Sequence, residues 1–283
     1  MVRLFNNKKP IFYKNILESY PAKVKRYILK HLIECPGYMS DITTVLRIVK
    51  NQKVDISLWF DLHKPEDLSS FITAKFKRFG EHFVPKADIV IVGVDTEGSQ
   101  SEFFLEFSNQ KIGILDEVMK EAENHFSFKL SGVGKQIDQV KNSLDTKNYF
   151  MCGIKYTGNS AEELKICFNI NKKLLLSFEI PQYFSRLLDR FGLDQFRGER
   201  SYAINRGGEI IETIGWMVDC GFLPNFDIFI EALEKLSWTQ PLVEELKLYA
   251  KKDYSSFLRW GWFSYSLQNN NISGIKVTLN YDE

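Results

Sequence analysis

A recurring pair of strand-like segments is the feature that most constrains the fold of this chain. Residues 87–109 (ADIVIVGVDTEGSQSEFFLEFSN) and 148–169 (NYFMCGIKYTGNSAEELKICFN) each contain two alternating runs joined by a glycine-containing polar turn. This arrangement is typical of a β-hairpin. Three further copies have the same shape: residues 42–63, turning at Asn51-Gln52; residues 201–218, the weakest copy, turning at Gly207-Gly208; and residues 259–281, with an Asn-rich turn. The sequence therefore predicts five antiparallel hairpins.

Helical patterns lie between these hairpins. Residues 65–80 (PEDLSSFITAKFKRFG) begin with Pro65 and acidic residues and end on Gly80, as helices often do. Apolar residues spaced by three and four predict further helices over residues 22–34, 114–126, 134–144, 180–192 and 226–236. Residues 174–180 (LLLSFEI) fit a strand or a helix equally well. The order helix, strand, strand, helix is thus repeated about five times.

These repeats predict an α+β fold. One hairpin with a single apolar face is unstable alone in water, but five hairpins can close into a ten-stranded antiparallel β-barrel without edges. Five repeated α-β-β-α units would then surround the barrel with an outer ring of helices. We expect residues 1–283 to form a single domain, with the first ~20 residues as an extension. An open α+β sandwich built from the same units is the alternative.

The opposite faces of the predicted strands differ in chemistry. In ELKICFNI, residues 163–170, every second residue is apolar, and the other face carries Lys165, Cys167 and Asn169. If helices cover the apolar faces, the mixed faces line the barrel interior. The same alternation places these further residues inside: Arg47, Trp59, Asp61, Phe104, Glu106, Tyr149, Lys155, Trp262, Lys276 and Asn280.

Several lysine and arginine side chains in an enclosed interior would repel each other unless an anion joins them. A diphosphate fits this role, because lysine and arginine donate charge-assisted hydrogen bonds to its oxygens. Aromatic rings beside it would stabilise a carbocation and exclude water. An anion site next to aromatic rings is what ionisation of an allylic diphosphate requires. The alternative is that Arg47, Lys165 and Lys276 lie on a solvated sheet face.

With these strand pairs and inward basic residues, the chain from about Ala22 to Tyr281 resembles the soluble aromatic prenyltransferases with the ABBA (PT-barrel) fold. The resemblance implies transfer of a dimethylallyl or geranyl group from its diphosphate to an electron-rich acceptor. Such an acceptor is an indole, a phenol or an aromatic side chain of a natural product or peptide. A non-catalytic barrel that binds a hydrophobic anion is the alternative.

The resemblance also implies roles for individual residues. The diphosphate would be held by Arg47, Lys155, Lys165, Asn169, Tyr202, Arg206, Lys276 and Asn280. The allyl cation and the acceptor would be surrounded by Trp59, Phe104, Tyr149 and Trp262. An inward carboxylate would take the proton that the acceptor ring loses, with Glu106 as the first choice and Asp61 as the second.

Composition and missing motifs exclude other classes of protein. The net charge of +1 gives no nucleic-acid-binding surface, and the scattered Cys35, Cys152, Cys167 and Cys220 fit neither a disulfide framework nor a zinc site. There is no run of 18 apolar residues and no signal peptide, so we expect a cytoplasmic protein that does not bind membranes. An aspartate-rich DDxxD motif is also absent, so we expect no required cofactor and only an optional magnesium ion. A monomer and a homodimer both fit the sequence.

Overall fold

The computed structural model describes residues 42–62, 74–96, 98, 100–142, 144, 149–189, 198–218, 223–251, 258–268 and 271–281, together with the single residues 22, 25, 26 and 72. Most of the helix predicted over residues 22–34 and the first part of the helix predicted over residues 65–80 lie outside these ranges.

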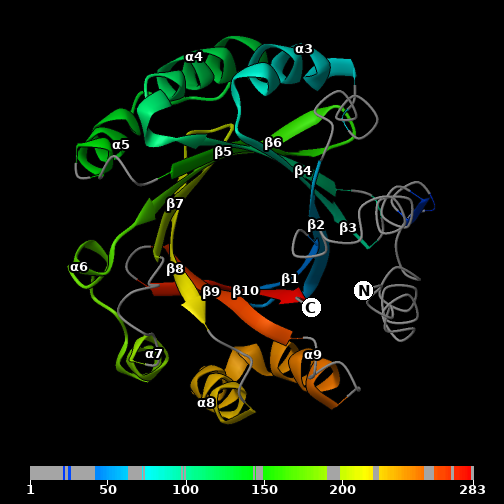
Figure 1. The fold of residues 1–283 in the computed structure, drawn as a ribbon, viewed down its shortest axis with the longest axis vertical. Helices are drawn as coiled ribbons and strands as arrows, with labels where there is room; N and C mark the ends of the chain where they lie inside the picture. The colour runs from blue at the N-terminus through cyan, green and yellow to red at the C-terminus, as the bar shows by residue number, and fades with distance from the viewer. Residues whose placement is uncertain are drawn as a thin grey trace, which may run out of the picture.

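The described strands form one closed antiparallel barrel. The ten strands are β1 (Ile42–Val49), β2 (Asp55–Asp61), β3 (Ile89–Asp95), β4 (Gln100–Ser108), β5 (Tyr149–Thr157), β6 (Ser160–Ile170), β7 (Gly198–Asn205), β8 (Ile210–Val218), β9 (Leu258–Gln268) and β10 (Asn271–Tyr281). Each strand pairs with its neighbours in the chain, and β1 pairs with β10 to close the sheet (Figure 1). The predicted ten-stranded barrel is confirmed, and the open sandwich is excluded.

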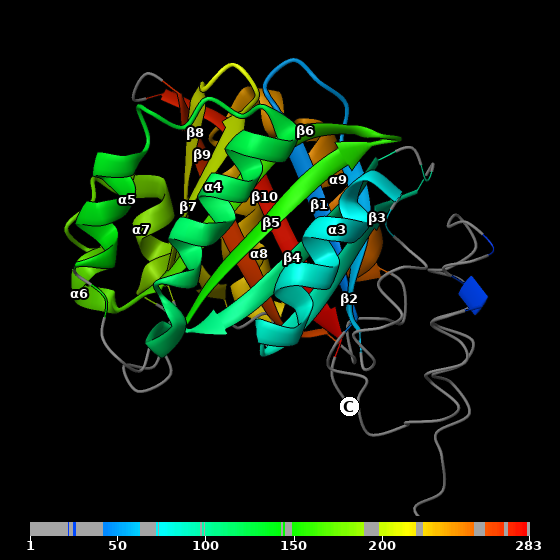
Figure 2. The same cartoon turned by 90° about the horizontal axis from the view of Figure 1, so that it is seen from above.

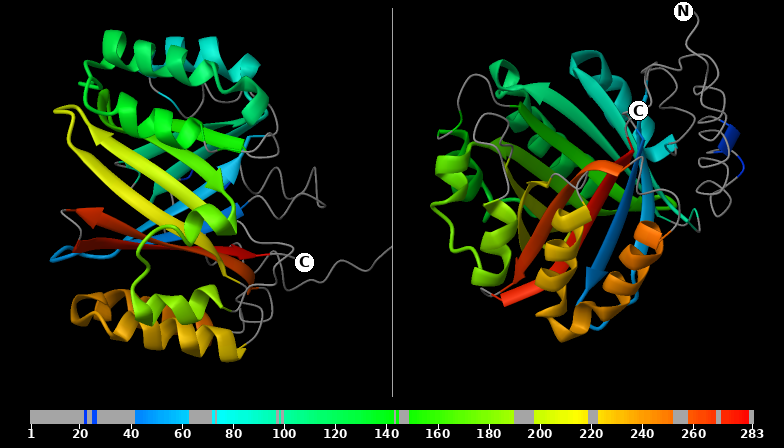
Figure 3. Two further views of the ribbon diagram at one scale, coloured as in Figure 1. Left: turned by 90° about the vertical axis from the view of Figure 1, so that its left-hand side faces the viewer. Right: turned by 60° about the horizontal axis from the view of Figure 1, so that its bottom comes forward.

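The described helices lie outside the barrel. They are α3 (Ala74–Phe83), α4 (Ile114–Phe126), α5 (Gly134–Lys141), α6 (Lys172–Leu175), α7 (Gln182–Leu188), α8 (Leu223–Glu234) and α9 (Gln240–Lys251), with the 3-10 turns η3 (Val84–Lys86), η4 (Asn109–Lys111) and η6 (Ser237–Thr239). In Figure 2 the strands run obliquely beneath α3 and α4. Figure 3 shows α8 and α9 covering the opposite side. The helices thus cover the outer face of the sheet.

The main core lies between the sheet and these helices. Outward residues of the strands are buried against the apolar stripes of the helices, as at Phe103, where the ring of Phe79 from α3 makes an edge contact. On the other side of the barrel, Phe184 of α7 and Phe229 of α8 pack on Phe263 of β9. Because helices cover the apolar outer face of the sheet, the other face of each hairpin lines the interior of the barrel.

Local sequence explains most of the turns. Asn51 adopts φ 68° in the turn between β1 and β2, and Gly158 adopts φ 56° between β5 and β6. Asparagine and glycine tolerate this left-handed conformation, so both predicted turns are found where expected.

One expectation about a helix needs correction, and one open assignment is resolved. Helix α3 does not end at Gly80 but continues to Phe83. Phe83 is fully buried and extends the apolar stripe of Phe76 and Phe79, so packing outweighs the poor helix propensity of glycine. The ambiguous residues 174–180 belong to no strand, because α6 ends at Leu175 and turns follow.

Candidate active site

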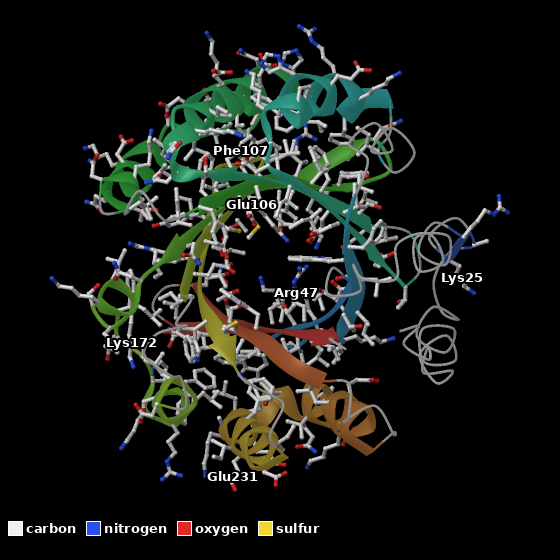
Figure 4. The ribbon with its side chains drawn as sticks, in the orientation of Figure 1. Lys25, Arg47, Glu106, Phe107, Lys172 and Glu231 are labelled. Atoms are coloured by element: carbon white, nitrogen blue, oxygen red, sulfur yellow. The ribbon has the colours of Figure 1, made fainter. Side chains whose placement is uncertain are left out.

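Alternation along the strands brings charged side chains into the barrel. In Figure 4, Arg47 of β1 and Glu106 of β4 project into the interior, whereas the neighbouring Phe107 points out to the helix layer. Lys172 of α6 and Glu231 of α8 lie on the outside of the molecule. Inward positions therefore differ from outward positions in charge as well as in direction, as the sequence pattern predicts.

Glu102 on β4 joins two cations inside the barrel. Its Oε1 accepts a hydrogen bond of 2.7 Å from Lys165 Nζ on β6 and one of 3.3 Å from Arg47 Nη2 on β1. Only 5% of Glu102 is exposed, and the side chains of Arg47 and Lys165 keep 18% and 14% exposure. Arg47 also lies 3.5 Å from Asp55, and Lys165 lies 3.8 Å from Glu163. The two cations are therefore held within one connected network of carboxylates.

The pKa values in this network follow from burial and charge together. Burial raises the pKa of Glu102, but Lys165, Arg47 and Lys155 outweigh it, so that pKa lies well below its usual range. Burial and the neighbouring Arg47 lower the pKa of Lys165 despite the attraction of Glu102. Burial also opposes the charge of Arg47, yet Glu102, Asp55 and Glu163 raise its pKa overall. Glu102 is thus held ionised and is a poor proton acceptor.

A second charged group lies on the neighbouring wall. Lys276 of β10, opposite Arg47 in the register, places its Nζ 3.9 Å from Glu199 Oε1 of β7 and 5.4 Å from the centre of the Trp59 ring. Cys167 lies between the two groups: burial and the charge of Glu199 raise its pKa to about 12, against the opposing effect of Lys276 and Lys165. The basic residues of β1, β6 and β10 therefore meet inside the barrel.

Inward glycines make room for the aromatic rings. Trp59 and Gly93 are partners across β2 and β3, and a Cβ on Gly93 would lie 2.6 Å from the Trp59 ring. Phe104 has the same relation to Gly153, where a Cβ would lie 2.6 Å from the ring and 2.1 Å from a backbone oxygen. The two rings are 5.0 Å apart between centroids. Because they lie flat on glycine backbone, they form an aromatic wall beside the cations.

Trp262 of β9 extends this pattern. A Cβ on Gly215 would lie 2.9 Å from its Nε1. Tyr149, by contrast, begins β5 next to the end of β4, where it pairs with Ser108. Of the four predicted aromatic residues, three thus lie over inward glycines in the interior.

The predicted polar residues are placed as follows. Lys155 lies near Glu102 and Lys165 and influences the pKa of both. Asn169 faces inward and donates to Gly198 O at 3.4 Å. Asp61 and Glu106 occupy inward positions near the ends of β2 and β4. Asn280 pairs with Thr43 in the backbone, and its side chain lies outside the described residues.

The interior placement of Tyr202 and Arg206 is wrong. Tyr202 faces outward: it is 1% exposed, and its ring packs edge-on against Phe168 in the outer core. Arg206 follows the last residue of β7 and is exposed in the hairpin turn. The inward residues of β7 are instead Glu199, Ser201 and Ala203, because they alternate with the buried outward residues.

Sequence reasoning did not identify the two buried carboxylates, Glu102 and Glu199. Glu102 was within reach, because it lies two and four residues before Phe104 and Glu106 on the same face of β4. Glu199 was hidden by the wrong face assigned to β7.

The interior is not a purely basic site. Among the described residues, four inward positions are basic (Arg47, Lys155, Lys165 and Lys276) and seven are acidic (Asp55, Asp61, Asp95, Glu102, Glu106, Glu163 and Glu199). No three His, Cys, Asp or Glu side chains within the described ranges are grouped to hold a metal ion. Arg47, Lys165 and Lys276 thus already form ion pairs with carboxylates before any ligand binds.

Comparison with known proteins agrees with the fold. No protein-family model matches the chain, and no curated protein matches its sequence. Solved structures do match. The crystal structure of NotF prenyltransferase aligns with a TM-score of 0.59 and 14% identity, over 99% of this chain and 96% of that one.

Two further solved structures match over most of both chains. AnaPT from Neosartorya fischeri has a TM-score of 0.58 and 12% identity, over 96% of this chain and 91% of that one. The 6-dimethylallyltryptophan synthase from Micromonospora olivasterospora, in complex with DMASPP and Trp, has a TM-score of 0.59 and 11% identity, over 89% and 87%. Within the described residues, no helix has both the length and the apolar character needed to cross a membrane. This chain has the ABBA-type barrel fold of the aromatic prenyltransferases.

Proposed function

We propose that the protein is an aromatic prenyltransferase that moves a dimethylallyl or geranyl group from its diphosphate to an electron-rich acceptor. The supporting observation is the meeting of Arg47, Lys165 and Lys276 beside the rings of Trp59 and Phe104 inside a closed barrel. Among the solved structures with this fold, one is named as a prenyltransferase and another as a dimethylallyltryptophan synthase.

In the proposed reaction, the C–O bond between the prenyl group and the diphosphate breaks, and the electron pair leaves with the diphosphate. Arg47, Lys165 and Lys276 would donate to the diphosphate oxygens and stabilise the charge that develops there. Each must exchange a carboxylate for the ligand, Glu102 for the first two and Glu199 for Lys276. The ligand thus replaces existing ion pairs.

The aromatic residues would act on the other fragment. Ammonium nitrogens already lie 5.8 Å from the Phe104 ring centre and 5.4 Å from that of Trp59, so the ring faces are accessible to a cation. An allyl cation beside them would be stabilised by the same quadrupole. Electrons of the acceptor form the new bond, and an inward carboxylate, Glu106 or Asp61, takes the proton that the ring loses.

The proposal is tested by Lys165→Ala and Lys276→Ala, assayed with dimethylallyl and geranyl diphosphates, indole and phenol acceptors, and mass detection of the added prenyl group. Runs with and without magnesium establish whether the metal is needed. Loss of one transition-state contact of this kind costs about 100- to 1,000-fold in kcat, so both variants should be nearly inactive while remaining folded. Lys172→Ala, on the outside of the barrel, is the control and should retain activity. Full activity in both interior variants would contradict the proposal.

A non-catalytic barrel that holds a hydrophobic anion is the competing function. It would show retention of the intact prenyl diphosphate with no product from any acceptor. An interior with more acidic than basic positions disfavours a lone anion in both cases, and the structural neighbours named for prenyl transfer support the enzyme.

A further inference from the structure

Glu199 is a buried carboxylate with too few partners. The residue is 6% exposed, and its Oε1 has no hydrogen-bond donor among the described residues. Lys276 Nζ lies 3.9 Å from that oxygen, which is beyond hydrogen-bond distance. Buried carboxylate oxygens in proteins are nearly always hydrogen-bonded, so an unpartnered one calls for an explanation, and a donor group on a ligand is one that the interior position of Glu199 allows. Glu199 lies on β7, within the same interior as the proposed prenyl site.

Binding of a diphosphate makes the need for a donor greater. In the proposed function Lys276 turns to the diphosphate, which leaves Glu199 without the one cation that pairs with it among the described residues. An isolated carboxylate in a buried position is strongly disfavoured unless another positive charge replaces the lost one. A diphosphate offers only acceptor oxygens, so it cannot fill this place. The second substrate or a metal ion can supply such a positive charge.

The described residues favour the second substrate. No three potential metal ligands are grouped within those ranges. A nitrogen cation, by contrast, already fits beside Glu199, because the ammonium of Lys276 lies between this carboxylate and the ring of Trp59. The interior also has seven acidic positions and four basic ones among the described residues, and a bound diphosphate adds more negative charge. This excess of negative charge favours a positively charged second substrate.

We propose that the acceptor carries a positively charged nitrogen, an ammonium or guanidinium group, that donates to Glu199 inside the barrel. This inference rests on the proposed function and narrows its acceptor to basic molecules. Glu199 is then a specificity-determining residue, because it binds the acceptor's charge and takes no part in bond making. Binding of the cationic acceptor and of the diphosphate should each strengthen the other, since their charges are opposite.

A matched pair of probes tests the inference. Tryptamine and tryptophol share one indole ring and differ in an ammonium against a hydroxyl group. We expect the wild-type protein, with inorganic diphosphate present, to bind tryptamine about 10- to 100-fold more tightly than tryptophol, the range of a charge-assisted hydrogen bond in a buried site. Calorimetric titration measures this ratio. With dimethylallyl diphosphate, the ratio of kcat/KM values should show the same preference.

Variants assign the preference to one carboxylate. Glu199→Gln should bring the ratio close to one, and Glu199→Asp should restore part of it. Glu162→Gln is the matched control, because Glu162 is exposed on the neighbouring strand β6 and should leave the ratio unchanged. Thermal unfolding of each variant establishes that it is folded. If Glu199→Gln does not fold, the binding ratios of the wild type and of Glu199→Asp still test the inference.

The outcomes separate the two proposals. Equal binding of both probes by the wild type, or a preference that persists in Glu199→Gln, overturns the inference. A preference for tryptamine in binding with no prenylated product from any acceptor leaves the cation site standing and overturns the proposed function. Efficient prenylation of tryptophol and tryptamine alike supports the proposed function and refutes the cationic acceptor.

Discussion

Glu102→Gln should make the protein less stable and, at the same time, a better diphosphate binder. The carboxylate is 5% exposed and accepts hydrogen bonds from Arg47 and Lys165. Glutamine keeps the shape but removes the charge, so two cations lose their main partner. Removing one member of a buried ion pair costs about 3–5 kcal/mol.

The structure reduces this cost. Arg47 retains Asp55 at 3.5 Å, and Lys165 retains Glu163 at 3.8 Å. Both cation side chains also keep some exposure to water, 18% and 14%. We therefore expect a loss of about 2–3 kcal/mol in the free energy of unfolding. For a chain of 283 residues the unfolding entropy is about 0.6 kcal/mol/K, so the Tm should fall by about 3–5 °C.

Binding of inorganic diphosphate should change in the opposite direction. In the wild type the ligand competes with Glu102 for Arg47 and Lys165, and the carboxylate repels it. If competition with Glu102 weakens diphosphate binding by the wild type by about 1–2 kcal/mol, the variant should bind diphosphate about 5- to 30-fold more tightly. Calorimetric titration at two salt concentrations measures the change, and diphosphate should raise the Tm of the variant more than that of the wild type.

Glu162→Gln provides the control for Glu102→Gln, because it removes the same charge from an exposed site on the barrel. It should alter neither the Tm nor the diphosphate affinity measurably. The reasoning fails if Glu102→Gln binds diphosphate no more tightly than the wild type, because Arg47 and Lys165 would then not be the groups that hold it. An unchanged Tm would show that the ion pairs make no net contribution to stability.

Two further predictions follow from the interior. Gly93→Ala and Gly153→Ala should each lower the free energy of unfolding by about 1–3 kcal/mol, since the new Cβ would press on the Trp59 or Phe104 ring, whereas Gly113→Ala has open space and should be near neutral in thermal unfolding. The stabilisation that Glu102 provides should also depend on pH: burial raises its pKa, but Lys165 and Arg47 lower it below its ordinary 4.5, so the contribution is complete above that value and is lost as the pH falls below it. The difference in unfolding free energy between the wild type and Glu102→Gln should therefore be constant near neutral pH and shrink on acidification, and a difference that grows in acid would contradict the assignment.

The sequence predicts the barrel well because each hairpin carries its own evidence. Alternation and turn residues are local properties, and a covering helix follows or precedes each strand pair. The interior faces of β1, β6 and β10 are readable for the same reason: Arg47, Lys165 and Lys276 interrupt otherwise apolar alternation. When the apolar neighbours of a polar strand residue are buried under helices, the polar residue must lie on the opposite face, which lines the interior.

The interior face of strand β7 cannot be identified in this way, because its outward face also carries polar residues. Arg200 and Tyr202 point toward the helix layer, where Arg200 Nε lies 2.6 Å from Glu212 Oε1 of β8 and its guanidinium packs 4.6 Å from the centre of the Phe178 ring. These partners come from another strand and from the segment after α6. A charged residue that is compensated by distant segments looks in the sequence like an interior residue, so the two faces of β7 are not distinguishable from alternation alone.

Contacts across the interior are even harder to predict from local sequence. Glu102 reaches Arg47 three strands away on one side and Lys165 two strands away on the other, and these distances depend on barrel closure and on the register of every intervening pair. The alternation of residues along a strand can place a side chain inside the barrel, but it does not identify the residue with which that side chain pairs. The sequence therefore predicted interior cations that lack a partner until an anion binds, whereas the structure shows that carboxylates already pair with them.

This pre-pairing has a consequence for how the protein would select its ligands. Unpaired cations in a closed barrel would bind any small anion and would destabilise the fold when empty. Arg47, Lys165 and Lys276 already pair with Glu102 or Glu199. In the proposed function they would exchange these partners for a ligand whose several oxygens reach all three cations together. A diphosphate has that reach, whereas a monoanion would meet one cation at a time and lose to the resident carboxylate. Selectivity for the diphosphate would thus come from competition inside the protein as much as from attraction.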